Sequence, residues 1–579
     1  MNIHEYLSKK LNKALLSLGV KYTNNIVHIR KSSQIKFGDY QVDGIIAISK
    51  KNGLLPNNLA KKIFYKLELD NIAKKIEVTD SGFINIFLNK NWLKDQLKII
   101  LISSRLGINL VKKQNIVVDY SSPNMAKEMH VGHIRSTIIG DSMVRIFEFL
   151  GHNVIRSNHI GDWGTQFGMI LAYLDSIKLN LSLKKIKLYN LENFYRIAKK
   201  NYDKDPLFAE NSRKYVVKLQ KYDNNCIKIW KKLLNLTIND NQKNYKLLNV
   251  TLTKDDIMGE SIYKNMLPKI VEDLKNKGLA IEKEGATVVF LNEFKNKYGK
   301  SMGVIIKKKD GAYLYTTTDI ACVKYRYEKF KAERIIYYID SRQNQHLRQV
   351  WYIVRKANYI PESVKLEHHM LGMILGKNGK PFKTRTGDIA KLSELIDEAL
   401  KRARNLIFDK TKNIKYSKIE YLSKIVGIGA IKYADLSKKR YKNYIFDWNK
   451  MLNFKGNTAL YIQYAYTRIV SLLKKSNIIN IYYLSDDLDL KEKEDIKLAV
   501  CLLQYHETIN IVANDGMPHI LCTYIYNLAV IFTNFYEKFP ILKENNESLR
   551  NSRLKLALLT ARTLKQGLSL LGIKTVEIM

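Results

Sequence analysis

A strand, a polar loop and a helix follow one another between residues 115 and 151, and this unit limits the fold more than any other stretch. Asn115–Asp119 (NIVVD) is a short apolar run that predicts a buried strand. Apolar residues then recur at three- and four-residue spacing from Ile134 to Leu150, and Gly151 is a natural helix end. A strand that enters a helix in this way opens an α/β domain.

Two histidines and a lysine crowd the start of this helix. The loop before it reads SPNMAKEMHVGH, with Lys127, His130, Gly132 and His133 at its end. A helix N-terminus offers unpaired N–H groups and positive potential, which suit a phosphate. Imidazoles three residues apart can face one site, and the glycine between them lets a flat ring approach the backbone. The alternative is a pair of capping or core histidines.

A second cationic segment lies about 250 residues downstream. Residues 376–387 read GKNGKPFKTRTG, with three glycines and the cations Lys377, Lys380, Lys383 and Arg385. Such a loop can close over a leaving pyrophosphate and stabilise its developing charge. The alternative is a solvated basic turn.

The rest of the chain indicates several domains, because 579 residues are too many for one core. Residues 1 to about 110 mix helical and strand-like patterns, and residues from about 393 onward show helical periodicity. Strand signals return near residues 287–291, 302–306, 334–339 and 367–370. A Lys/Asn/Leu-rich helical segment at 178–285 separates these signals from the first strand, so we expect a long insertion that splits an α/β fold.

The net charge of +42 favours a polyanionic partner, above all nucleic acid. A genome rich in A and T, which enriches Lys, Asn, Ile and Tyr, is the competing explanation. The four cysteines lie far apart and indicate neither a zinc site nor a disulfide framework, as in a reducing cytosol. The first 20 residues form an amphipathic pattern rather than a signal peptide, and residues 521–535 are too polar to span a bilayer. We therefore expect a cytoplasmic protein with no membrane partner.

Several motifs together resemble a known family. The H-x-G-H helix start and the later K-x-x-K-[ST] resemble the two ATP-binding signatures of class I aminoacyl-tRNA synthetases. Within that class, the chain is similar to arginyl-tRNA synthetases in five collinear stretches, at residues 121–133, 158–168, 310–320, 340–346 and 462–469. The resemblance covers essentially the whole chain.

The resemblance implies an α/β fold with a Rossmann-like parallel-sheet catalytic domain split by a helical insertion, an N-terminal α+β module and a C-terminal α-helical anticodon-binding bundle. The implied parts are a tRNA D-loop-recognition module at 1–110, the first catalytic half at 111–177, an inserted connective segment at 178–298, the second catalytic half at 299–392, a helical stem-contact region at 393–450 and the anticodon-binding domain at 451–579.

The resemblance also implies site residues. For ATP binding and catalysis they are Lys127, His130, Gly132, His133, Lys380 and Lys383. The second signature departs from the family pattern at Pro381-Phe382, and Lys127 stands where the family places a supplementary lysine on the triphosphate. For arginine they are Asp119, Ser122, Asn124, His133, Tyr315, Asp319 and Gln343. Tyr315 and Asp319 are the leading candidates for the guanidinium, which a planar set of fixed acceptors can distinguish from a lysine ammonium. For Asp119, a structural role at the end of the strand is the alternative to contact with arginine.

For tRNA the implied residues are Phe83 and Asn85 in the N-terminal module and Tyr461, Tyr464 and Arg468 in the helical tail. An aromatic ring with an amide edge is a common way to distinguish unstacked bases. Core packing of Phe83 and of the tail tyrosines is the alternative.

The implied reaction is ATP-dependent activation of L-arginine to arginyl-adenylate, followed by transfer to the 2′-hydroxyl of the terminal adenosine of tRNA-Arg. Mg²⁺ on the phosphates follows from the chemistry, and no protein metal site is identified. We expect a monomer, and the resemblance implies an activation step that requires bound tRNA. Two rivals remain at this point: another nucleotidylyl transferase with an H-x-G-H helix, such as a pantothenate-synthetase-like enzyme, and a non-catalytic RNA-binding paralogue.

Overall fold

The computed structural model describes residues 2–20, 27–32, 34–177, 188–295, 298–376, 378–380, 382, 390–410, 415–476 and 488–577. The chain forms two compact units. One unit contains residues 110–452 and the short segment 570–573, and the other contains residues 1–109, 453–569 and 574–579.

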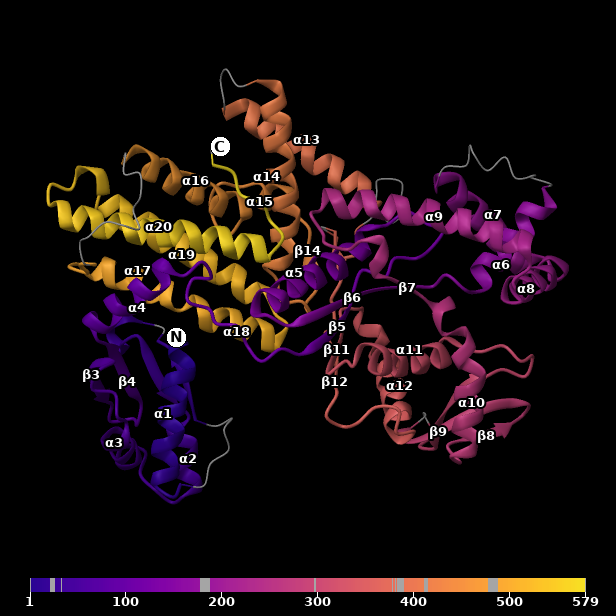
Figure 1. The fold of residues 1–579 in the computed structure, drawn as a ribbon, viewed down its shortest axis with the longest axis horizontal. Coiled ribbons are helices and arrows are strands. Elements are labelled where there is room, and N and C mark those ends of the chain that lie inside the picture. Colours follow the sequence, from indigo (N-terminus) through magenta and orange to yellow (C-terminus); the bar gives the residue numbers. More distant parts are fainter. Residues whose placement is uncertain are drawn as a thin grey trace. The chain divides into compact units, whose positions relative to one another are not determined.

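Five parallel strands form the central sheet of the 110–452 unit, in the order β12-β11-β5-β6-β7 (Figure 1). In chain order they are β5 (Asn115–Asp119), β6 (Asn153–Ile160), β7 (Ile257–Gly259), β11 (Arg334–Tyr337) and β12 (Lys365–His368). Val117 of β5 lies opposite Ile155 of β6 on one side and Ile335 of β11 on the other. The chain adds strands on one side of β5 and later returns to its other side, as in doubly wound folds. The predicted Rossmann-like parallel sheet is confirmed.

Helices pack on this sheet through apolar side chains. Helix α5 (Ile134–Leu150) approaches β5 so closely that a Cβ at Gly140 would lie 2.3 Å from the Cβ of Tyr120. As predicted, it ends at Gly151, whose φ of 99° is left-handed. Helices α11 (Tyr315–Phe330) and α12 (Asn344–Lys356) share one hydrophobic core with Val117 and Ile335.

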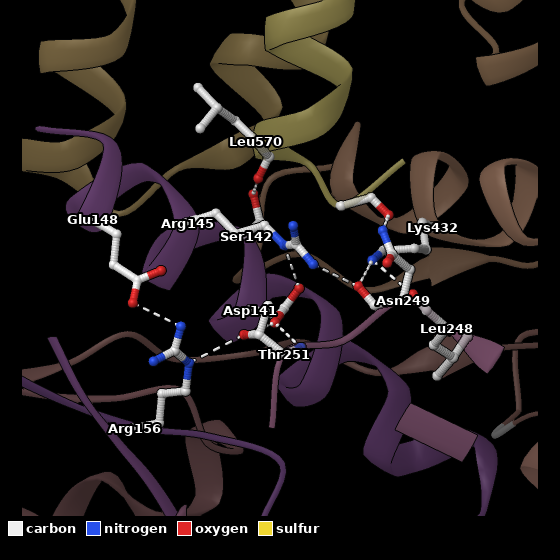
Figure 2. A network of polar contacts seen from close by, with 11 residues as sticks. Asp141, Ser142, Arg145, Glu148, Arg156, Leu248, Asn249, Thr251, Lys432 and Leu570 are labelled. Atoms are coloured by element: carbon white, nitrogen blue, oxygen red, sulfur yellow. Dashed lines mark hydrogen bonds and ion pairs between the residues drawn. The ribbon is translucent and has the colours of Figure 1, made fainter. Parts of the chain in front are cut away.

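A buried polar network fixes the middle of α5 (Figure 2). Asp141 accepts from the backbone N–H and hydroxyl of Thr251 and pairs with Arg145 one turn along the helix. Arg145 also donates to the carbonyl of Asn249, which lies 3.5 Å from the Nζ of Lys432. Lys432 itself is fully buried and donates to the Leu248 carbonyl at 2.9 Å. The network therefore joins α5, the chain that leads into β7, and the helix that carries Lys432.

Segment 570–573 also contributes backbone carbonyl acceptors to this network. Ser142 donates to the Leu570 carbonyl at 3.1 Å, and the side-chain amide of Asn249 donates to the Gly572 carbonyl at 3.0 Å. A Cβ at Gly572 would lie 2.3 Å from the Nζ of Lys432, and its φ of 66° is left-handed, so the position favours glycine. Residues far apart in the sequence thus meet around one helix.

A helical insertion separates β6 from β7. It consists of α6 (Thr165–Ser176), α7 (Leu188–Lys204), α8 (Pro206–Gln220) and α9 (Asn224–Leu247). Its helix starts follow local rules: Asp205 caps α8 by accepting the Leu207 N–H, with Pro206 at the first helical position. Asp223 caps α9 by accepting the Cys226 N–H at 2.9 Å.

A second, antiparallel sheet follows β7, and it differs from the expected arrangement. After α10 (Leu267–Asn276) come β8 (Ala280–Lys283), β9 (Ala286–Lys295) and β10 (Ser301–Lys307), in the order β10-β9-β8. The strand signals near residues 287–291 and 302–306 therefore belong to this hairpin-linked sheet and not to the parallel sheet. Apolar runs alone do not show which of the two sheets a strand joins, because both sheets bury strands of this kind.

Three helices and a small parallel pair complete this unit. The helices are α13 (Leu392–Lys410), α14 (Tyr416–Leu436) and α15 (Trp448–Met451), and the pair joins β13 (Ile374–Leu375) to β14 (Tyr444–Ile445). Lys432 of the α5 network lies on α14.

The other unit combines a small α+β module with a helical bundle. The module has the antiparallel sheet β1-β2-β4-β3, made of β1 (His28–Lys31), β2 (Tyr40–Asp43), β3 (Ala73–Val78) and β4 (Ile84–Leu88). Its helices are α1 (Ile3–Ser17), α2 (Ile45–Lys51), α3 (Pro56–Lys66) and α4 (Lys90–Ile102). The bundle contains α16 (Ala459–Lys475), α17 (Lys493–Leu503), α18 (Tyr505–Asp515), α19 (Pro518–Lys538) and α20 (Glu547–Leu570).

One buried carboxylate ties the module to the bundle. Glu507 of α18 accepts from the hydroxyl of Tyr40 at 2.9 Å and the backbone N–H of His4 at 3.2 Å, and it forms an ion pair with the Nζ of Lys31 at 3.0 Å. Residues of α1, β1 and β2 therefore converge on a single carboxylate. The module and the bundle belong to one compact unit.

Candidate active site

The candidate site lies where the direction of strand addition reverses, between β5 and β11. In open α/β sheets, ligands bind outside the carboxyl ends of the strands at this switch point. The loop that follows β5 carries residues 120–133, and residues 338–343 follow β11. Most of the predicted ATP and arginine residues therefore come to the same edge of the sheet.

The two histidines form a reciprocal cap at the start of α5. The backbone N–H of His130 donates to Nδ1 of His133, and the N–H of Gly132 donates to Nδ1 of His130, both at 3.1 Å. The ring centroids lie 3.8 Å apart. Because each Nδ1 accepts a hydrogen bond, a neutral ring carries its proton on Nε2. Both Nε2–H groups are then donors, and among the described residues neither has a hydrogen-bond acceptor.

Both imidazoles are held neutral by their surroundings. Burial lowers the pKa of His133 to about 3, and the neighbouring His130 adds to this effect. Burial also lowers the pKa of His130, and the positive charge of Lys127 adds to it. The cap thus supplies fixed N–H donors rather than acids, and Lys127 supplies the positive charge.

Gly132 is required by the close approach of the first ring. A Cβ at this position would lie 2.8 Å from Cε1 and 2.9 Å from Nδ1 of His130. The sequence predicted this geometry, in which a flat ring lies close to the backbone at Gly132.

The base of the cationic loop meets the histidine pair. The N–H of Val131 donates to the Ala390 carbonyl, and the N–H of Leu392 donates to the Met129 carbonyl. The side chain of Lys391 pairs with Glu128 at 3.0 Å. The end of the loop is therefore joined to the H-x-G-H segment by backbone and side chain.

The two lysines of the second signature are Lys380 and Lys383. Lys380 is exposed, in a turn that the Gly376 N–H closes onto the Lys380 carbonyl at 2.8 Å. Lys383 lies outside the described residues. Phe382, between them, donates its N–H to the Ile374 carbonyl and packs on Phe446.

A second group of candidate residues contains two carboxylates, Asp319 and Glu260. Tyr315 is 63% exposed at the start of α11, with its ring against His346, and Asp319 one turn later accepts from Nε2 of His346 at 2.6 Å. The structure thus brings both leading guanidinium candidates onto one helix face. Glu260, directly after β7, is the second carboxylate, and it interacts electrostatically with Asp319.

Glu260 was missed by the sequence reasoning. Burial raises its pKa to about 7, with His159 opposing the shift and Asp319 and Asp162 adding to it. A buried carboxyl with a raised pKa beside another carboxylate is an arrangement that a cation would stabilise. Its sequence signal is an acidic residue immediately after the apolar run Ile257–Gly259, which the preceding helical insertion obscures.

The structure places Asp119 differently from the other arginine candidates. Its carboxylate is buried and accepts from the fully buried Arg326 and, at 3.1 Å, from the hydroxyl of Ser122. This favours the structural alternative, in which Asp119 supports the end of β5. Asn124 and Gln343 are both exposed.

The loop around Ser122 has strained backbone. Ser121, Ser122 and Ala126 have φ values of 71°, 45° and 60°, in the left-handed region that side chains rarely adopt. Strain of this kind persists where surrounding contacts impose it, and it is common at ligand sites. Here the N–H of Ser121 donates to Ser136, and that of Ser122 donates to Asn158.

The predicted tRNA residues all lie in the unit that contains the module and the bundle. Phe83 is half-buried just before β4, and Asn85 is buried within β4, where its side-chain oxygen accepts from Gln41 at 2.8 Å. On α16, Tyr464 and Arg468 are exposed, and Tyr461 packs against Tyr526.

Arg468 also lines a cavity of about 250 Å³ between α16 and α19. Its guanidinium lies 5.8 Å from the ring centroid of Tyr464 and 5.9 Å from that of Tyr536. Lys475 and Phe532 complete the cationic and aromatic lining. Rings beside cations are typical of sites for unstacked bases.

Within the described parts of the chain, no three His, Cys, Asp or Glu side chains gather as a metal site. Among the helices that the structure describes, none combines the length and the apolar character needed to cross a bilayer.

Comparisons with known proteins agree over the whole chain. Family models match the class I (R) tRNA synthetase catalytic domain at residues 96–448, the DALR anticodon binding domain at 462–579 and the arginyl tRNA synthetase N terminal domain at 1–88. The arginine–tRNA ligases of Sodalis glossinidius and Pectobacterium atrosepticum are 59% and 57% identical to the chain, with all of both chains covered in each case.

Solved structures give the same result. The arginyl-tRNA synthetase of Plasmodium falciparum is 31% identical, covers 100% of this chain and 99% of its own, and superposes with a TM-score of 0.87. That of Thermus thermophilus shares the fold, with a TM-score of 0.83 at 23% identity and full coverage of both chains. The protein described here belongs to the arginyl-tRNA synthetase family of class I tRNA synthetases.

Proposed function

We propose that this protein is an arginine–tRNA ligase that activates L-arginine with ATP and transfers it to tRNA-Arg. The observation that carries the proposal is a pair of neutral imidazole donors beside a lysine at the start of α5, with two interacting carboxylates, Glu260 after β7 and Asp319 on α11. Relatives at 56–59% identity over the whole chain, all named arginine–tRNA ligases, support it.

In the first step, a carboxylate oxygen of arginine attacks the α-phosphorus of ATP, and the bond to the pyrophosphate oxygen breaks. The Nε2–H groups of His130 and His133 donate to the phosphate oxygens, while Lys127, with Lys380 and Lys383 of the loop, offsets the charge that develops on pyrophosphate. Such in-line displacements depend on positioning and electrostatic stabilisation more than on proton transfer. Accordingly, the site needs no general base.

Arginine is held by its two charged ends. Its guanidinium lies between Asp319 and Glu260, with Tyr315 beside it, because these groups offer planar acceptors to a planar donor. Ser122, Asn124, His133 and Gln343 are placed to hold the α-amino and carboxylate groups. Asp119 pairs with Arg326 and thereby supports the end of β5.

ATP enters as its Mg²⁺ complex, in which phosphate oxygens are the principal ligands.

In the second step, the 2′-hydroxyl of the terminal adenosine attacks the acyl carbon and AMP leaves. The 1–110 module contacts the D-loop through Phe83 and Asn85, and the 451–579 bundle binds the anticodon through Tyr461, Tyr464 and Arg468. The cavity beside Arg468 supports this last assignment. The catalytic halves are 111–177 and 299–392, with 178–298 inserted and 393–450 on the tRNA stem, and the protein acts as a cytoplasmic monomer.

The test is arginine-dependent acylation of total tRNA, with His130→Ala as the control. We expect acylation by the native chain and a loss of about 10²- to 10³-fold in the variant, as for removal of one oxyanion donor. Pantothenate-synthetase-like chemistry would proceed without tRNA acylation, and a non-catalytic paralogue would bind tRNA with no turnover.

Pyrophosphate exchange tests the order of events. We expect exchange only when tRNA is present, since docked RNA completes the loop around Lys127 and Lys383. Brisk exchange without tRNA would contradict this part of the proposal.

A further inference from the structure

We propose that Tyr195, on helix α7 of the inserted segment, is a positioning residue that holds the Lys127 ammonium at the ATP site. The inference rests on the proposed function, because it takes the histidine pair as the place where the triphosphate binds. It assigns to the insertion a part in ATP binding.

The contact between the two side chains is direct. The Nζ of Lys127 lies 4.6 Å from the ring centroid of Tyr195, which is half-buried. At this separation a lysine ammonium is attracted to the negative face of an aromatic ring. The same charge lowers the pKa of His130, after the larger effect of burial. The ammonium is therefore close enough to the first histidine for its charge to act on it.

A second contact brings the same face of α7 to the site. Glu192, three residues before Tyr195, lies 4.0 Å from the Nζ of Lys391. Residues three apart on a helix lie on one face. Lys391 pairs with Glu128 and forms a backbone bridge with His130. Through Glu192 and Tyr195, α7 thus reaches the cations on both sides of the histidine pair.

The physical effect is preorganisation. A lysine on a flexible four-carbon stem loses rotamer freedom when it binds a phosphate, and this loss weakens binding. A ring that already confines the ammonium removes part of that loss before ATP arrives. An attraction at a partly exposed site corresponds to about a 2- to 30-fold effect on ATP affinity.

The experiment measures the KM for ATP in tRNA aminoacylation for a series at position 195. We expect Tyr195→Leu to raise it about 2- to 30-fold, with the KM for arginine little changed. Tyr195→Phe, which keeps the ring face, restores the low value. Phenylalanine analogues with one, two and three ring fluorines keep the shape but weaken the negative face, so the KM should rise with each fluorine.

Two controls separate this effect from a general disturbance of α7. Tyr202→Leu removes the same kind of contact, to Lys199 at 5.7 Å on the same helix, and should leave the KM for ATP unchanged. In a Lys127→Met background, Tyr195→Leu should add no further loss, because the two residues act as one unit. A native chain that acylates tRNA, with a KM for ATP that is flat across the fluorinated series, would overturn the inference. A native chain that fails to acylate tRNA would instead overturn the proposed function.

Discussion

Arg326 donates to the carboxylate of Asp119 with both side chains buried, at the end of β5. The chain's own guanidinium thereby neutralises the carboxylate at the strand end. We propose that the guanidinium of a substrate finds its acceptors elsewhere, at Asp319 and Glu260. In this proposal, Asp119 supports the strand end and the other two acids recognise arginine.

Breaking the Asp119–Arg326 pair is expected to cost stability. Arg326→Met leaves a buried carboxylate without its partner, and such a loss typically lowers the free energy of unfolding by about 3–5 kcal/mol. Asp119→Asn should also destabilise, but the double variant should lose less than the sum of the two. Urea unfolding of the four proteins checks this, and additive losses would show that the contact is not a coupled pair.

Glu260 is expected to give arginine use a pH dependence near neutrality. Its pKa of about 7 means that it is protonated below pH 7 and cannot pair with a guanidinium there. The value of kcat/KM for arginine should therefore fall as pH decreases through 7, and it should level off above. In Glu260→Gln the inflection should disappear, and kcat/KM should be low at every pH. An unchanged inflection in the variant would assign the titration to another group.

The histidine pair is expected to show no such dependence. Because the pKa of His133 is about 3 and that of His130 lies below its ordinary value, both rings are mainly neutral from pH 7 upward. The KM for ATP, measured over the same range as the arginine profile, should change little. A rise in ATP affinity on acidification would instead indicate that an imidazolium binds the phosphates.

Gly132→Ala is expected to damage ATP binding, because the new methyl group would meet the His130 ring at 2.8 Å. Displacing this ring removes an N–H donor from the phosphate site, so we expect the KM for ATP to rise at least about tenfold. Gly164→Ala is the matched control, since a Cβ there meets nothing within 4 Å and its φ of −153° is open to any residue. Equal effects of the two changes would refute the steric explanation.

Lys432 is expected to make stability depend on pH. Burial lowers its pKa to about 8, with Asp141 opposing and Arg145 adding to the shift, whereas the unfolded chain keeps the ordinary value of 10.5. Between these values the unfolded chain binds more protons, so the free energy of unfolding rises with pH there, by up to about 3 kcal/mol.

In Lys432→Met the free energy of unfolding should no longer rise between pH 8 and 10.5. In Lys439→Met, a change at an exposed lysine, it should rise as in the native chain. Melting temperatures of the three proteins across that range provide the measurement. If native and Lys432→Met curves stay parallel, Lys432 is not the titrating group.

The sequence predicted the strand–loop–helix unit and its end at Gly151 because both depend on residues that are neighbours along the chain. The close approach of a ring at Gly132 and the helical tail likewise depend on residues that are near each other in the chain. Apolar runs also located β9, β10, β11 and β12. They did not show which sheet each strand joins, since pairing is decided by segments up to hundreds of residues apart.

Local pattern by itself thus determined the class of fold, the phosphate end of the site and the family. Only the tertiary structure decided which acid each cation neutralises. It turned Asp119 toward Arg326, brought Glu260 beside Asp319 and placed Tyr195 over Lys127. The physical reason is that the state of a charged side chain depends on burial and on partners supplied by other segments, and neither is encoded in the residues next to it.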